Sequence, residues 1–129
     1  MFGKVIAAAG ALVMVSAAPA FAQMGCVDPI APTAVDGAHA SQQQMKDAHA
    51  DVVDFMKSSD DYQQCLIDQV RSAKADAAKH AGDKGHPAFD PAIETNANAK
   101  IDANQRLKEK VGAEYNAAVA GYKATHPGG

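Results

Sequence analysis

The stretch SSDDYQQCLIDQV, Ser58 to Val70, decides the fold. It lies within a proline-free run that extends from Ser41 to Gly82, and the apolar residues of this run recur at steps of three and four, as one face of a helix requires. The stretch also holds Cys65, one of only two cysteines in the 129-residue chain. The pattern therefore predicts a long helix with a cysteine on its side, and the architecture depends on the partner of that cysteine.

A second helix is predicted on the same grounds. The apolar spacing indicates helices over about 41–81 and 90–123, with Ser41 and Asp90 as N-caps and Pro91 in the first position of the second helix. A connector this short favours an antiparallel hairpin and hence an all-α fold, in a register that sets Ser59 opposite Gly112. The residues predicted to line the helix seam are Val52, Phe55, Tyr62, Leu66, Val70, Ile101, Leu107, Val111, Tyr115 and Tyr122.

The N-terminus has the pattern of a secretory signal peptide over residues 1–22. Lys4 precedes an apolar run over residues 5–18, which is too short to span a membrane, and an A-x-A cleavage site ends at Ala22. We expect the mature chain to begin at Gln23 in the periplasm, without stable membrane insertion. The alternative is a lipoprotein acylated at Cys26, although Gln23 then occupies the position where such signals usually have leucine.

Export changes how the two cysteines are interpreted. In an oxidising compartment an even count favours a disulfide, and the only intramolecular pairing is Cys26 with Cys65. The alternatives are two free thiols or acylation of Cys26. The proline-containing segment 23–40 should be extended and, once stapled, should lie along the helical domain 41–129, with Val27, Ile30 and Val35 covering apolar surface.

Charge limits the expected partners. Removing Lys4 with the signal peptide leaves 11 basic residues against 15 acidic ones, a formal charge of −4. A negative chain is a poor electrostatic partner for nucleic acid or anionic lipid. Because two helices alone leave much of their seam exposed, we expect the seam residues to bind a second copy of the chain or another periplasmic protein.

Five histidines are the only candidate metal ligands. The predicted hairpin gathers His39, Met45, His49 and His126 at its open end, a set of soft and imidazole ligands that would suit copper or zinc. His80 and His86 flank the connector, together with Asp83 and Asp90. The alternative interpretation is that all five are solvated surface residues, because no pair of histidines has the spacing of a specific metal motif.

No residue pattern predicts catalysis or a bound cofactor. Asp60 and Asp61 are adjacent and so point about 100° apart on a helix. Ser58 and Ser59 have no histidine–aspartate partner in the pattern. Ser59 and Asn104 interrupt the apolar stripes, where polar residues more often set the register of two helices than carry chemistry.

The chain resembles a group of small, uncharacterised exported bacterial proteins. The shared motifs are a Cys-x2-Pro-x2-Pro start, here Cys26, Pro29 and Pro32, and a helix with Tyr-x2-Cys-Leu, here from Tyr62 to Leu66. The resemblance implies a periplasmic location and the same cysteine pair, and no activity. We therefore expect a non-enzymatic periplasmic protein with a structural or protein-interaction role, and periplasmic copper or zinc binding is the alternative.

Overall fold

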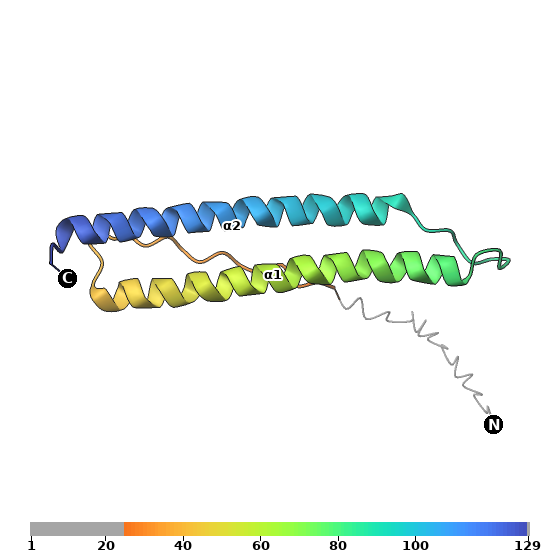
Figure 1. The fold of residues 1–129 in the computed structure, drawn as a ribbon, viewed down its shortest axis with the longest axis horizontal. Helices are drawn as coiled ribbons and strands as arrows, with labels where there is room; N and C mark the ends of the chain where they lie inside the picture. The colour runs from red at the N-terminus through yellow and green to blue at the C-terminus, as the bar shows by residue number, and fades with distance from the viewer. Residues whose placement is uncertain (1–24, 129) are drawn as a thin grey trace, which may run out of the picture.

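Two long helices make up most of the molecule. The computed structural model describes residues 25–128, in which α1 (Gln42–Lys79) and α2 (Pro91–Thr125) lie antiparallel with no strand in that range (Figure 1). The predicted all-α hairpin is confirmed, with helix bounds within two residues of those expected. The predicted signal peptide and the start at Gln23 lie outside the described residues.

Each helix begins at the residue that the sequence predicts. The Ser41 side chain accepts a hydrogen bond from the Gln44 backbone N–H, and the Gln44 side chain accepts one from the Ser41 N–H, which completes a capping box. The Asp90 side chain caps α2, with Pro91 directly after it.

The seam between the helices has coiled-coil spacing. The buried residues of α2 recur every seven positions, and those of α1 recur at steps of three and four through the middle of the helix, which is the pattern of knobs-into-holes packing. These buried residues are Phe55, Ser59, Tyr62 and Leu66 on α1 and Ala97, Asn104, Val111 and Ala118 on α2.

The predicted register is wrong by about one helical turn. Gly112 lies beside Met56 instead of Ser59, while the Ser59 hydroxyl accepts a hydrogen bond from Asn104 Nδ2 at 3.2 Å. A stripe with steps of three and four looks nearly the same after a shift of one turn, so apolar spacing alone does not define the register. The buried polar pair discriminates between registers, because an unpaired amide in the seam would be costly.

A third segment lies against the hairpin. We call residues 25–40 the strap: it runs back from the open end, where the chain enters α1, to the middle of α1 (Figure 1). There Cys26 is bonded to Cys65, with 5.7 Å between the two Cα atoms, and no free cysteine remains in the described chain. The predicted disulfide and the stapled extended segment are confirmed.

The strap contacts the helices with a period of three. Its inward residues Cys26, Pro29, Pro32, Val35 and Ala38 are all half-buried. A repeat of three is that of polyproline II, so the Cys-x2-Pro-x2-Pro spacing places one edge of the strap on the hairpin.

The same period overturns one expectation about the strap. Val27 and Ile30 were expected to cover apolar surface, but they are 82% and 93% exposed. They lie on an edge of the strap next to the one that contacts the hairpin. Of the three valines and isoleucines named for this role, only Val35 packs against a core cluster, together with Met45 and Ala118 at the open end.

At the open end the strap touches the backbone of α2. A Cβ atom added to Gly37 would lie 1.7 Å from the Ala118 carbonyl oxygen, and one added to Gly121 would lie 3.2 Å from the Ala38 nitrogen. Gly37 does not have a positive φ, so this position needs glycine for space and not for backbone conformation.

The core is confined to the part of the hairpin that the strap covers. One buried cluster lies at the open end, and a second joins Tyr62, Leu66 and Ala97 beside Cys26. Every residue from 67 to 96 is exposed or half-buried. The connector end therefore consists of two helices and a loop with no buried residue of their own.

Candidate functional site

Two parts of the described structure are candidate sites: the connector end and the outer face of the strap. At the connector end α1 finishes at Lys79, and the loop 80–90 turns back on the helix. Gly82 and Gly85 have φ values of 88° and 89°, a conformation that favours glycine, and they allow the loop to fold tightly. Backbone hydrogen bonds from Asp83 to His80 and from His86 to Asp83 complete the two turns.

These turns bring two histidines onto one carboxylate. Asp76 and His80 are one helical turn apart, with 3.3 Å between Asp76 Oδ1 and His80 Nδ1. His86 returns from the loop and places its Nε2 3.2 Å from Asp76 Oδ2. The two imidazole rings stack with centroids 4.3 Å apart. Within the described chain this is the one group of three or more histidine, cysteine or acidic side chains whose ligand atoms all lie within 4.8 Å of one another.

Both histidines were expected beside Asp83 and Asp90, but the carboxylate that they contact is that of Asp76. Asp76-x3-His80 has the i, i+4 spacing that places two side chains on one face of a helix. That spacing was the available signal. The return of His86 depends on the two glycine turns, which the sequence suggests only as a break in the helix.

The open end does not assemble the predicted metal site. His39 is bound to Asp36, with 2.6 Å between Nδ1 and Oδ2, while the His49 ring lies 5.7 Å from the Tyr115 ring. His126 stacks on Tyr122 at 4.1 Å. His39, His49 and His126 are not among the described groups of three ligands whose atoms all lie within 4.8 Å of one another.

Met45, the fourth predicted ligand, is also unsuited to that site. It is 8% exposed and packs with Ala40 and Ala118 in the open-end core. A thioether in this position fills space between the strap and α2. Each of the four predicted ligands therefore has another contact. His39 pairs with Asp36, His49 and His126 contact tyrosine rings, and Met45 packs in the core.

Charge coupling at the open end has a local cause. The hydrogen bond to the Asp36 carboxylate raises the pKa of His39, and the bond from His39 lowers the pKa of Asp36. Asp36 also accepts a hydrogen bond from the Ala38 N–H at 3.1 Å. The pair belongs to the turn that carries the strap into α1.

The predicted seam residues lie on the inner faces of the hairpin. All ten are buried or half-buried. The polar position beside them is fully paired: Gln63 Nε2 donates to Asn104 Oδ1 at 2.8 Å, and Asn104 Nδ2 donates to Ser59 Oγ. Burial raises the pKa of Tyr62 in the same seam, with a smaller contribution from Asp28.

The strap face is the second candidate site. Val27 lies beside a surface hollow that it lines with Asp61 and Tyr62, and Ile30 lies beside a second hollow that it lines with Asp51 and Asp54. Both hollows are open to solvent. The edge of the strap formed by Val27 and Ile30 is called the ridge below.

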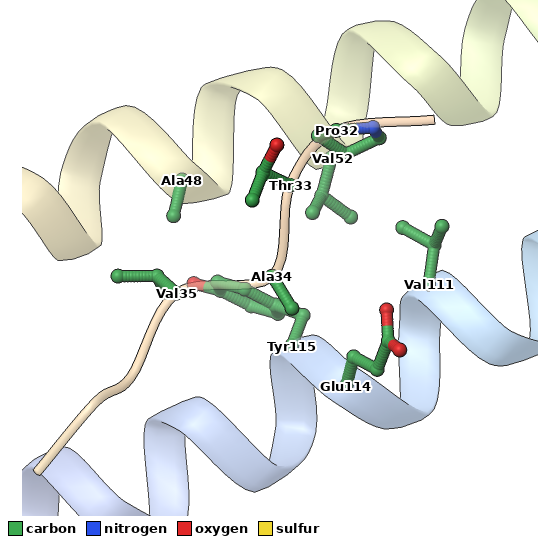
Figure 2. Close-up of a pocket in the computed structure, with 9 residues that line it drawn as sticks. All are labelled: Pro32, Thr33, Ala34, Val35, Ala48, Val52, Val111, Glu114 and Tyr115. Atoms are coloured by element: carbon green, nitrogen blue, oxygen red, sulfur yellow. The ribbon is translucent and has the colours of Figure 1, made fainter. Parts of the chain in front are cut away.

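A small, partly open pocket lies between the strap and the two helices. It measures about 20 Å³ and is lined by residues of the strap and of both helices (Figure 2). Val52 and Tyr115 approach it from the two helices, and Ala34 approaches it from the strap. Ligand pockets for small molecules are typically about 300 Å³ or more. This cavity could hold a water molecule, and an organic ligand would not fit.

Comparisons with known proteins add no assignment. The chain matches no protein-family model, and no curated protein or solved structure matches it. No helix within the described residues is long and apolar enough to cross a membrane.

Proposed function

We propose that this is a non-enzymatic, periplasmic helical protein that acts by binding another protein through the ridge of its strap. The observation that carries the proposal is the near-complete exposure of Val27 and Ile30 on a segment that the disulfide holds in place. Neighbouring apolar side chains that are exposed together and rimmed by polar residues commonly mark a protein-interaction site. The periplasmic location is supported by the predicted signal peptide and by the disulfide.

The non-enzymatic part of the proposal rests on what the polar residues do. The Ser59 hydroxyl is buried and accepts from Asn104, so it is not available as a nucleophile. Asp60 forms an ion pair with Lys108 across the helices, and Asp61 forms one with Lys57 at 3.0 Å. Ser59, Asp60 and Asp61 therefore each have a partner within the hairpin.

Charge around the ridge indicates what kind of partner fits. Asp28, Asp51 and Asp54 are exposed beside it, and no ion pair joins them to a basic side chain in the described chain. A second copy docked on this face would set carboxylates against carboxylates, which disfavours association. The ridge therefore suits a basic protein segment that supplies apolar side chains for the ridge and lysine or arginine for its acidic rim.

A peptide titration tests the proposal. The probe is an amphipathic peptide of leucine and lysine, and the control is a serine–lysine peptide of equal length and charge. We expect the first peptide to bind in fluorescence anisotropy and the second to bind at least about tenfold more weakly, because charge alone does not use the ridge. Ile30→Asp should weaken binding by a similar factor, whereas Val53→Asp, a change at an exposed valine away from the strap, should not.

Two outcomes would overturn this assignment. If Ile30→Asp leaves the affinity of the leucine–lysine peptide unchanged, the ridge is not the binding surface. If sedimentation shows that the protein dimerises and that Ile30→Asp abolishes the dimer, the occupant is a second copy of the chain. Raising the salt concentration should weaken a basic partner, since the acidic rim contributes to binding.

A further inference from the structure

We propose that Asp76, His80 and His86 form a binding site for a divalent transition-metal ion of the zinc class. This site is separate from the ridge and does not depend on the proposed partner. It differs from the open-end set of histidines and methionine that the sequence suggested, because it is the grouping that the fold itself assembles.

The donor set is suited to such an ion. Two imidazoles and one carboxylate are the three protein ligands of many zinc sites that keep a position open for water or another ligand. Zinc-bound nitrogen and oxygen atoms at about 2.0–2.1 Å in a tetrahedron are roughly 3.3 Å from one another. The Asp76 oxygens already lie 3.3 Å and 3.2 Å from nitrogens of His80 and His86. Small side-chain rotations would direct the three ligands to one ion.

The surroundings of the site hold the ligands near this arrangement. His80 Nδ1, the nitrogen that lies 3.3 Å from Asp76 Oδ1, also lies 2.9 Å from the Asp76 carbonyl oxygen, so the ring is held beside the carboxylate. In the tautomer that carries its proton on Nε2, Nδ1 has a lone pair free to bind the ion. The imidazole side chains are 35% and 29% exposed, so an ion can reach them while their rings remain partly supported. Both rings line an open hollow with Pro87 and Phe89 from the returning loop.

A metal bound at this position would stabilise the connector end. The connector end contains no buried residue, and the loop is held to α1 by turn hydrogen bonds and these side chains. A metal bound by Asp76 and His80 on the helix and by His86 on the loop would tie the loop to α1. Binding should therefore stabilise the end of the molecule that has no core.

Calorimetric titration of untagged protein with Zn²⁺ at pH 7.5 tests the site. We expect one equivalent to bind with a micromolar Kd, and Mg²⁺ not to compete, since it prefers all-oxygen sites. His86→Ala and Asp76→Asn should each weaken zinc binding by about tenfold or more, because loss of a supporting contact alone typically costs about 10–100-fold. Binding should weaken at pH 5.5, where imidazole ligands are lost to protons.

Matched variants make the result interpretable. His49→Ala and His126→Ala remove histidines at the open end and should leave the affinity unchanged. Circular dichroism of each variant, together with a zinc-dependent rise in Tm that His86→Ala abolishes, separates loss of the site from loss of the fold. A Kd no tighter than millimolar, or one equivalent bound equally by wild type and His86→Ala, would overturn the proposal.

Discussion

Replacing Gly37 with alanine tests how the strap is seated on α2. The new Cβ would lie 1.7, 2.5 and 2.9 Å from the carbonyl oxygen, carbonyl carbon and Cα of Ala118, all of them backbone atoms. An ordinary carbon–oxygen contact is about 3.3–3.6 Å, so the strap must move away by roughly 1.5 Å. No side-chain rotation can relieve this clash.

The size of the effect follows from two opposing contributions. Overpacking of this kind costs about 1–3 kcal/mol, and the clash with rigid backbone places Gly37→Ala near the upper value. Reduced freedom of the unfolded chain returns about 0.4–1 kcal/mol. We therefore expect a net loss of about 2 kcal/mol in the free energy of unfolding. For a domain of this size that corresponds to a fall in Tm of roughly 8–16 °C.

Gly112→Ala is the matched control. Its Cβ would meet only the Met56 Cε atom at 3.8 Å, an ordinary contact, in the interior of α2. Removing glycine from a helix interior should stabilise the protein by about 0.5–1 kcal/mol. Thermal and urea unfolding followed by circular dichroism should move the two variants in opposite directions. If Gly37→Ala is as stable as wild type, the strap is not in contact with the α2 backbone.

Three further predictions concern the staple, the seam and the open-end turn. Reducing the disulfide should lower the free energy of unfolding by about 4 kcal/mol in the chain-entropy model, and an unchanged guanidinium midpoint with reductant would contradict it. Ser59→Ala should lower the free energy of unfolding in urea by about 1–3 kcal/mol, because it leaves the buried Asn104 amide without its acceptor. The double variant Ser59→Ala with Asn104→Leu should recover most of that loss, because no unpaired amide remains. Titration followed by NMR should give His39 a pKa above 6.5 and Asp36 one below 3.8, and Asp36→Asn should return the His39 pKa to its ordinary value. The stabilisation that His39 contributes is lost as the pH rises through its raised pKa. The stabilisation that Asp36 contributes is lost as the pH falls through its lowered pKa. If Asp36→Asn leaves the pKa of His39 unchanged, the pairing is refuted.

The sequence was sufficient for the elements and for the covalent link. Helix ends follow from local chemistry, such as the Ser41 cap and Pro91 at the start of α2, and local chemistry can be read directly. The disulfide followed from export and an even cysteine count. These features depend on a few neighbouring residues or on a single available pairing.

Features that depend on three dimensions were not predicted. The register is selected by the Asn104–Ser59 hydrogen bond, whose two members are 45 residues apart. Val27 and Ile30 face solvent because the strap contacts the hairpin at every third residue. The spacing of Cys26, Pro29 and Pro32 already shows this period of three. The prediction of an extended segment did not use it. The grouping of Asp76, His80 and His86 depends on the loop geometry that returns His86 to α1.

The unequal reach of the strap has a consequence for how the molecule opens. From the open end to Cys65 the hairpin is three segments thick, while residues 67–96 have neither strap nor buried residues. Local opening free energies should differ accordingly, since regions with few buried contacts open first. Backbone amides of the connector half should exchange with deuterium well before those of the stapled half. The connector half would then unfold and refold locally while the stapled half, which carries the ridge, stays folded.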